Sequence, residues 1–264
     1  MNLHISIIQT KLFWEDIDAN LAMLEEKIWQ VEANTDLILL PEMFSTGFTN
    51  KAPLFAEPMN GKTFKWMKQQ AAQTTAAIVG SYIVRADTFY YNRLIWMQPD
   101  GKYFTYDKRH TFSLSGEDKV YMAGNQRLIV NWRGWKICPM ICYDLRFPIW
   151  SRNKIVDQIY EYDLLLFVAN WPDSRNAAWE TLLKARAIEN SCFCAGANIV
   201  GKDGNGLQYI GNSSIYNPLV ENMLTTNSED NIFSTTISKV ELDIYRKKYP
   251  FLEDGDGFEL KKVC

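Results

Sequence analysis

The chain contains the run Lys136-Ile137-Cys138-Pro139-Met140-Ile141-Cys142-Tyr143-Asp144-Leu145-Arg146-Phe147-Pro148, in which an apolar segment stops at a cysteine. The apolar part is typical of a short buried strand, and a turn follows it at once. A strand that breaks sharply into a turn and a helix leaves its last side chain exposed, as a hydrolase nucleophile requires. A thiol becomes a strong nucleophile once a nearby base takes its proton, whereas most cysteines with apolar neighbours are inert core residues. Cys142 is therefore a candidate nucleophile.

Two other predicted strands also end on a charged residue. Asp36-Leu37-Ile38-Leu39-Leu40-Pro41 leads into Glu42, and Tyr103-Phe104-Thr105-Tyr106-Asp107 leads into Lys108. A carboxylate that is partly desolvated among apolar neighbours can accept a thiol proton. An ammonium can stabilise the negative charge that develops on an attacked carbonyl oxygen. Each charge alone is more often a solvated surface residue, but together the three strand ends supply the parts of an acyl-transfer site.

Composition limits the class of protein. The 264 residues are 47% hydrophobic and 14% aromatic, enough for a sizeable core, and the net charge is only -3. Because no Lys/Arg stripe interleaves with aromatic residues, nucleic acid is not an expected partner. No leader sequence or long apolar run is visible, so no membrane partner is expected either. Five cysteines, an odd number, lie mostly in apolar stretches, which favours a cytoplasmic protein with free thiols.

Hydrophobic periodicity predicts one α/β domain over residues 1–264, with a C-terminal tail from about residue 251 to residue 264. Strands are predicted at residues 3–9, 36–40, 77–84, 163–169, 191–200 and 232–237. Hairpins are predicted from residues 89–98 with 102–106 and from residues 127–132 with 135–142. Helices are predicted from an N-cap at Asp18 and at residues 61–75, 148–158, 179–190 and 239–248. The mixture indicates one mixed sheet or two stacked sheets.

Three blocks resemble the signature blocks of the nitrilase superfamily of carbon–nitrogen hydrolases. They are Pro41-Glu42-Met43-Phe44, Asp107-Lys108-Arg109-His110 and residues 141–148. Two further blocks, Val168-Ala169-Asn170-Trp171-Pro172 and residues 185–190, are similar to the bacterial omega-amidase-like branch. The resemblance extends from the first strand to about Asn217. It departs from that branch at Ala178, where a histidine is expected before Trp179.

The resemblance implies an α-β-β-α sandwich of two mixed β-sheets flanked by helices. A homodimer would complete a four-layer α-β-β-α-α-β-β-α assembly. It further implies a cofactor-free amidase in which Glu42 is the base, Cys142 the nucleophile, and Lys108 stabilises the oxyanion together with the backbone N–H of Tyr143. Glu117 aligns with a second glutamate that positions the lysine and contacts the substrate amide. From the residues alone, Glu117 and the adjacent Asp118 are both candidates, and either could be a loop charge.

The resemblance also implies a substrate class. Omega-amidases cleave the terminal amide of a small 2-oxo acid, so the pocket needs a cation for the distant carboxylate. Arg175 is the best candidate, although a solvated loop arginine is an equal alternative. Trp171, Tyr143 and Phe44 are expected to form aromatic walls. Another nitrilase-branch amidase, acting on carbamoyl or aliphatic amides, and a catalytically silent binding protein on the same fold remain alternatives.

The remaining polar residues suggest supporting roles. With only two histidines in the chain, a Cys-His dyad is disfavoured, and His110 is expected to hydrogen-bond behind the site. Asp107 and Arg109 are expected to pair at the surface, and Arg146 to brace the turn through acidic partners. Cys192 and Cys194 lack the further Cys/His pair that a tetrahedral zinc site needs, so no metal is expected.

Overall fold

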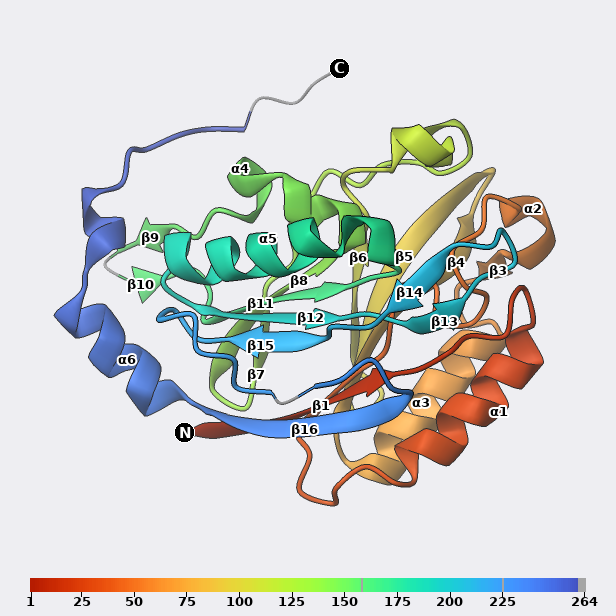
Figure 1. Ribbon diagram of the computed structural model, residues 1–264, viewed down its shortest axis with the longest axis horizontal. Helices are drawn as coiled ribbons and strands as arrows, with labels where there is room; N and C mark the ends of the chain where they lie inside the picture. The colour runs from red at the N-terminus through yellow and green to blue at the C-terminus, as the bar shows by residue number, and fades with distance from the viewer. Residues whose placement is uncertain (158, 225, 261–264) are drawn as a thin grey trace.

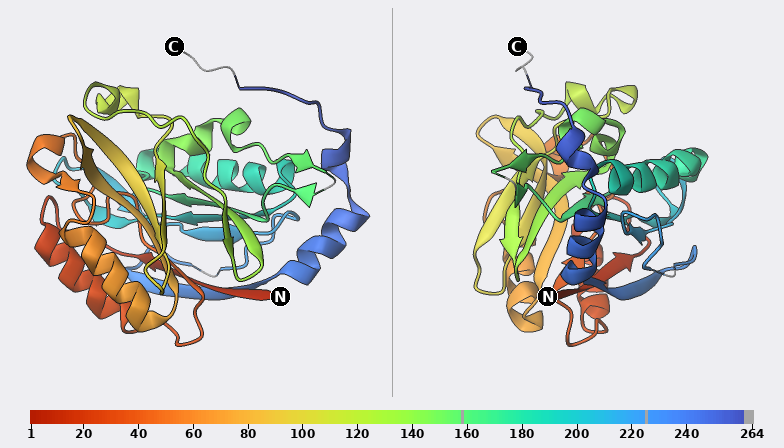
Figure 2. Two further views of the ribbon diagram at one scale, coloured as in Figure 1. Left: turned by 180° about the vertical axis from the view of Figure 1, so that it is seen from behind. Right: turned by 90° about the vertical axis from the view of Figure 1, so that its left-hand side faces the viewer.

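The computed structural model describes residues 1–157, 159–224 and 226–260. Two β-sheets pack face to face, and helices cover the outer face of each sheet (Figure 1). Figure 2 shows the same layers from behind and from the side, with the N-terminus beside the last helix. The predicted α-β-β-α sandwich is therefore confirmed for the described residues. The last four residues of the predicted tail, including Cys264, lie outside them.

The first sheet joins the N-terminal half of the chain to a late strand. Within the described residues it has seven strands, in the order β16-β1-β2-β4-β5-β6 with β3 beside β4. Their bounds are β1 Asn2–Gln9, β2 Leu37–Leu39, β3 Glu57–Pro58, β4 Ala77–Ala86, β5 Phe89–Met97, β6 Tyr103–Asp107 and β16 Asn231–Ser238. β1, β2 and β4 run parallel, whereas β16, β5 and β6 pair antiparallel to their neighbours, so the sheet is mixed.

The second sheet carries the cysteine strand. Its five strands, counted over the described part of the chain, follow the order β15-β12-β11-β8-β7. Their bounds are β7 Val130–Trp132, β8 Trp135–Ile141, β11 Leu164–Val168, β12 Phe193–Ala197 and β15 Ser214–Tyr216. β8, β11 and β12 are parallel, so their carboxyl ends meet at one edge of the sheet. Two small hairpins lie outside the sheets, β9 Ile155–Val156 with β10 Ile159–Tyr160 and β13 Val200–Lys202 with β14 Gln208–Ile210.

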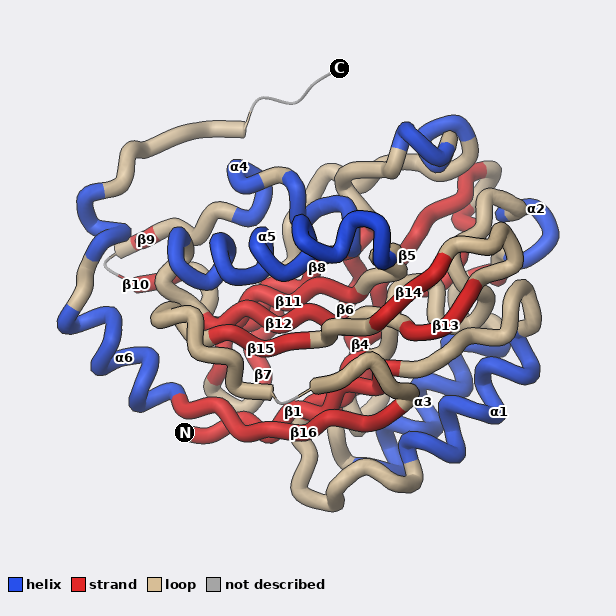
Figure 3. The backbone as a smooth tube through the Cα atoms, viewed as in Figure 1, coloured by secondary structure: helices blue, strands red, loops and turns tan. Residues whose placement is uncertain are grey.

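Amphipathic helices close the two outer faces (Figure 3). α1 (Ile17–Ile28) and α3 (Lys62–Thr74) cover the first sheet, and α5 (Asn176–Glu189) covers the second. Gly196 of β12 permits close packing of α5, because a Cβ there would lie 2.6 Å from the Trp179 ring. The other helices are the short α2 (Ala52–Phe55) and α4 (Pro148–Ser151), and α6 (Lys239–Lys248) after the last strand.

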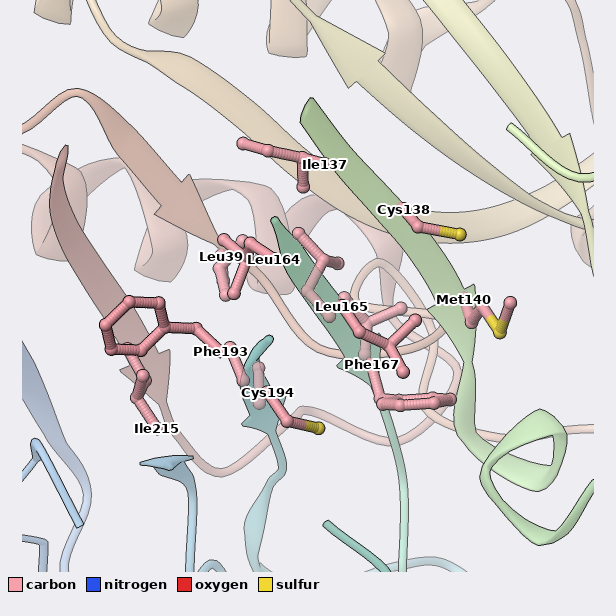
Figure 4. Packing of buried hydrophobic residues seen from close by; sticks show 14 of the residues in the cluster. Leu39, Ile137, Cys138, Met140, Leu164, Leu165, Phe167, Phe193, Cys194 and Ile215 are labelled. Carbon is pink, nitrogen blue, oxygen red and sulfur yellow. The ribbon is translucent and has the colours of Figure 1, made fainter. Parts of the chain in front are cut away.

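The main core lies between the sheets. Apolar side chains of β8, β11 and β12 are fully buried there, and Leu39 of the first sheet faces them (Figure 4). Cys138, Cys192 and Cys194 are buried free thiols, so the prediction that Cys192 and Cys194 serve core packing is confirmed. Among the described residues, no helix combines the length and apolar character needed to cross a membrane.

Two local predictions are wrong. The helix predicted for residues 148–158 ends after one turn at Ser151, and the β9–β10 hairpin follows it; residue 158 itself lies outside the described residues. Nothing in the one-dimensional pattern separates that hairpin from a longer helix, because Ile155 and Val156 suit both. The N-cap of α1 is Asp16, whose side chain accepts the Ala19 amide, and not the predicted Asp18.

Candidate active site

One pocket lies where the carboxyl ends of β2, β6, β8 and β11 meet, the position at which α/β sheets generally bind ligands. Its volume is about 420 Å³. The pocket brings together Glu42, Lys108 and Cys142, which sequence analysis placed at three separate strand ends. Its remaining lining includes loop residues, among them Trp14, Phe48–Lys51, Phe112, Asp203 and Leu207, and Tyr209 of β14.

At the wall of the pocket, two carboxylates share one ammonium. Lys108 Nζ lies 2.8 Å from Glu42 Oε1 and 2.9 Å from Glu117 Oε2, and all three side chains are at most 1% exposed. The structure therefore brings Glu117, and not Asp118, to the lysine. Such a cluster has one carboxylate more than its ammonium can neutralise, so it retains the capacity to accept a proton.

Cys142 stands at the turn after β8 in a strained conformation. Its φ of 41° lies in the left-handed region that residues with a Cβ rarely adopt. The turn continues as the 3₁₀ helix η3 (Cys142–Arg146), and Cys142 is half-buried while the other described cysteines are buried. This geometry presents its thiol to the pocket, as the strand-to-turn pattern predicts.

Burial and charge set the protonation of these groups. Burial, then the negative charge of Glu42 and a hydrogen bond with it, raises the pKa of the Cys142 thiol well above its ordinary value, against the opposing charge of Lys108. Burial alone would lower the pKa of Lys108, but Glu117 and Glu42 outweigh burial and raise that pKa. Burial raises the pKa of Glu117 as well, although Lys108 opposes the shift. The resting site therefore holds a neutral thiol beside a charged lysine.

A buried aspartate anchors the turn that carries Cys142. Asp144 accepts hydrogen bonds from the Ile141 amide at 3.1 Å and from the Tyr106 hydroxyl at 2.7 Å. It also accepts the His110 amide at 2.9 Å, and its Oδ1 lies 2.7 Å from His110 Nδ1. The predicted hydrogen-bonding role of His110 is confirmed, and the network joins the segment after Lys108 to the turn after Cys142.

Two buried asparagines complete the site and were missed from the sequence. Asn92 in β5 donates to Glu42 Oε1 at 2.8 Å and to Glu117 Oε1 at 3.3 Å. The backbone N–H of Asn170, after β11, donates to Glu42 Oε2 at 3.0 Å, and its side chain donates to the Glu42 carbonyl at 2.7 Å. The available signal for Asn92 was an amide within a strand of mostly aromatic and aliphatic residues, because a buried polar group needs partners.

The predicted aromatic walls divide into two kinds. Trp171 and Tyr143 line the pocket, as expected. Phe44 does not: it is fully buried between the first sheet and α3, with its ring centroid 5.8 Å from that of Trp66. Gly80 makes room for it, since a Cβ there would lie 2.7 Å from the Phe44 ring. Phe44 is therefore a core residue, although Glu42, two residues earlier in the sequence, lines the pocket.

The predicted cations also need correction. Arg175 lines the pocket, and so does Arg146, which was expected to brace the turn through acidic partners; Asp144 anchors that turn instead. Asp107 pairs with Arg93 and not with Arg109, because the antiparallel register of β5 and β6 sets Arg93 directly opposite it. Arg109 donates to the Gly124 carbonyl.

No group of three or more His, Cys, Asp and Glu side chains among the described residues could hold a metal ion.

At the position where the sequence departs from the omega-amidase-like branch, Ala178 packs at the edge of the main core. What the pocket offers chemically is a thiol, the Glu42 carboxylate and an ammonium that Glu117 also binds, which suffice for acyl transfer.

Comparisons with known proteins agree with this geometry. The carbon–nitrogen hydrolase family matches residues 4–247. The chain is 41% identical over 259 residues to the omega-amidase YafV of Escherichia coli K12, with 98% of each chain covered. It is 30% identical over 259 residues to the 2-oxoglutaramate amidase of Bacillus subtilis, with 96% of this chain and 98% of that protein covered.

A solved structure is similar over the whole chain. It is a carbon–nitrogen hydrolase superfamily protein from Xanthomonas campestris, determined with an arsenic adduct in its active site. The two sequences are 43% identical and the TM-score is 0.97, covering 99% of this chain and 100% of that one. The resemblance on which the sequence-based expectations rest is confirmed.

Proposed function

Because this chain belongs to the nitrilase superfamily of carbon–nitrogen hydrolases and its relatives include amidases, we propose that it is an omega-amidase-like enzyme. It hydrolyses the terminal amide of small 2-oxo-acid amides and releases ammonia. The observation that carries the proposal is the convergence of Cys142, Glu42 and Lys108 on one pocket. The names of the relatives, an omega-amidase and a 2-oxoglutaramate amidase, support the substrate class.

The reaction begins with a proton transfer. A Glu42 carboxylate oxygen takes the proton of the Cys142 thiol as the sulfur attacks the amide carbon, and the C=O electron pair moves to oxygen. Glu42 then gives the proton to the amide nitrogen, and the C–N bond breaks. Ammonia departs, and the acyl group remains on Cys142 as a thioester. A water molecule, deprotonated by Glu42, attacks the thioester, and the thiolate leaves and recovers the proton.

Lys108 is the oxyanion stabiliser in this scheme, together with the backbone N–H of Tyr143. Its Nζ is held by Glu42 and Glu117, so no reorganisation is needed when negative charge develops. Glu117 positions the lysine through its ion pair; because it is fully buried and does not line the pocket, we do not assign it the contact with the substrate amide that the resemblance implies. The raised pKa of Cys142 supports a mechanism in which the thiol proton is removed during attack and not before it.

The pocket also supports an anionic substrate. Arg175 lines it with its guanidinium carbon 5.3 Å from the centroid of the Phe112 ring, a cation–π contact that orients the side chain. We assign Arg175 to the substrate carboxylate, with Trp171 and Tyr143 as walls. A guanidinium suits this task because its planar fork matches both carboxylate oxygens.

Assembly and location follow as parts of the same proposal. We propose a homodimer that completes a four-layer assembly, supported by exposed apolar side chains on the outer helices, such as Ile188 of α5 and Ile244 of α6. Size-exclusion chromatography with light scattering tests it, and a monomer at micromolar concentration would contradict it. The four described cysteines are free thiols, which supports a cytoplasmic, reducing location.

The test of the function is an ammonia-release screen with the purified enzyme. The amides are 2-oxoglutaramate, 2-oxosuccinamate, glutamine, an N-carbamoyl amino acid and a neutral aliphatic amide. We expect the highest kcat/KM with a 2-oxo-acid amide. A clear preference for the carbamoyl or aliphatic compound would assign the chain to a sibling amidase, and no turnover of any amide would favour a silent binding protein.

A further inference from the structure

Arg146 and Arg175 have matching surroundings although they come from different elements. Arg146 ends η3, four residues after Cys142, and its guanidinium carbon lies 4.8 Å from the centroid of the Trp171 ring. Arg175 stands over Phe112 in the same way, at 5.3 Å. Both arginines are half-buried and line the pocket that holds Cys142. The two guanidinium groups therefore lie against aromatic walls of one pocket.

These two arginines also lack a negative partner. The other charged side chains of the pocket are already engaged: Glu42 binds Lys108, Glu15 binds Lys51, and Asp203 accepts hydrogen bonds from Tyr209, Asn205 and Leu207. Within the described part of the chain, neither Arg146 nor Arg175 forms an ion pair with a carboxylate. The pocket thus presents two positive charges without counter-charges.

Two half-buried guanidinium groups that line one pocket favour a ligand with several acceptor oxygens and no donors. A carboxylate satisfies one planar fork with its two oxygens. A 2-oxo group beside that carboxylate adds a third acceptor oxygen for the second fork. A 2-amino group in the same position is an ammonium, which offers only donors and would add a third positive charge.

We propose that Arg146 is a specificity-determining residue, which binds the 2-oxo oxygen of the substrate while Arg175 binds its carboxylate. Arg146 thereby selects 2-oxo-acid amides over the corresponding 2-amino-acid amides. This inference rests on the proposed function and deepens it, because it names the side chain that distinguishes 2-oxoglutaramate from glutamine. The aromatic contact with Trp171 holds the guanidinium in place before the substrate arrives.

The test compares four amides of similar length in wild type and three variants. The amides are 2-oxoglutaramate, glutamine, glutaramate, which has the carboxylate but no 2-substituent, and the neutral pentanamide. For Arg146→Met we expect kcat/KM for 2-oxoglutaramate to fall by roughly 10- to 100-fold, the scale of one lost charged hydrogen bond. The preference for 2-oxoglutaramate over glutamine should fall at least about tenfold. Arg175→Met is the matched control and should weaken 2-oxoglutaramate and glutaramate alike.

Arg146→Lys keeps the charge but loses the planar fork. Melting temperatures show whether each variant is folded, and Arg146→Lys replaces Arg146→Met in the test if Arg146→Met is unfolded. We expect Arg146→Lys to retain discrimination against glutamine while losing part of the kcat/KM for 2-oxoglutaramate. Equal losses for all four amides, pentanamide included, would make Arg146 a support of the turn and overturn the inference.

The same data separate the inference from the proposed function. A wild-type enzyme that prefers 2-oxoglutaramate, with a 2-oxo to 2-amino ratio that Arg146→Met leaves unchanged, overturns the inference alone. A wild-type enzyme that turns over pentanamide as well as 2-oxoglutaramate overturns the proposed substrate class, and the inference with it.

Discussion

The second sheet has a buried cluster of charges at each end of β11, and the two clusters are built in opposite proportions. At the amino end, the Asp163 carboxylate meets two cations, Arg246 at 2.7 Å and Lys239. At the carboxyl end, the Asn170 amide binds Glu42, and there two carboxylates share Lys108. One cluster has an excess of cations and the other an excess of carboxylates.

The two proportions have opposite effects on protonation. Burial alone would raise the pKa of Asp163, but hydrogen bonds from Lys239 and the Lys136 amide, with the cationic charges, lower it. Burial raises the pKa of Glu117, because one lysine cannot fully stabilise two buried carboxylates. A carboxylate saturated by cations can only hold the fold together, whereas a carboxylate in excess can take a proton. We therefore expect the Asp163 cluster to stabilise the fold and the Glu42–Lys108–Glu117 cluster to take part in catalysis.

The strongest contrast compares Glu42→Gln with Asp163→Asn. We expect Glu42→Gln to lower kcat by about 10²- to 10⁴-fold, the usual contribution of a general base, with little change in melting temperature. Asp163→Asn leaves two cations without their carboxylate and should reduce the free energy of unfolding by ~3–5 kcal/mol, with little change in kcat. Ammonia release and thermal unfolding measure the pair. If both variants affect the same property, the division of roles is wrong.

Lys108→Met tests the shared ammonium of the carboxyl-end cluster. We expect kcat to fall by at least ~10²-fold, the scale for one oxyanion donor, while KM changes much less. Steady-state kinetics with the best amide of the screen give both values. A change confined to KM would instead assign Lys108 to binding of the ground-state substrate.

Arg175→Ala examines a cation outside both clusters. Losing one charged hydrogen bond worth ~1.5–3 kcal/mol should raise KM for a 2-oxo-acid amide by roughly ten- to a hundredfold. A neutral amide of similar length should lose much less. Similar losses for charged and neutral amides would mean that Arg175 only supports its loop.

The pH dependence should show the smallest effect. Because burial and the charge of Glu42 raise the pKa of the Cys142 thiol, the thiol stays mostly protonated at and below the ordinary pKa of a cysteine. If Glu42 removes the proton during attack, kcat/KM should stay within about threefold between about pH 7 and about pH 9. A rise of about tenfold per pH unit over that range would indicate a preformed thiolate and contradict this mechanism.

Sequence reasoning identified residues that line the candidate pocket where the signal was local. Lys108 and Cys142 follow a strand directly and Glu42 comes three residues after one, so recognising the strand was enough to find each residue. It failed where a role depends on a distant partner: Asn92 acts through Glu42 fifty residues earlier, and Asp144 through Tyr106. The same reason explains the wrong partner for Asp107, since only the β5–β6 register sets Arg93 opposite it.

The fold was predictable to a similar degree. The two large hairpins and α6 follow from turn residues and apolar periodicity that lie within each segment. Phe44 was assigned to the pocket because it neighbours Glu42 in sequence. Its burial depends on Gly80, which leaves space under the ring and lies in a strand far along the chain. Contacts of that kind cannot be read from either residue alone.

The most direct test of the proposed thioester mechanism is to find the acyl group on the enzyme. Wild type and Cys142→Ala are mixed with the best amide, quenched in acid within milliseconds to seconds, digested and examined by peptide mass spectrometry. We expect the wild-type peptide containing Cys142 to gain the mass of the substrate minus ammonia, and Cys142→Ala to show neither adduct nor turnover despite an unchanged melting temperature. An acyl group on another residue, or ammonia release by Cys142→Ala at the wild-type rate, would rule out Cys142 as the nucleophile.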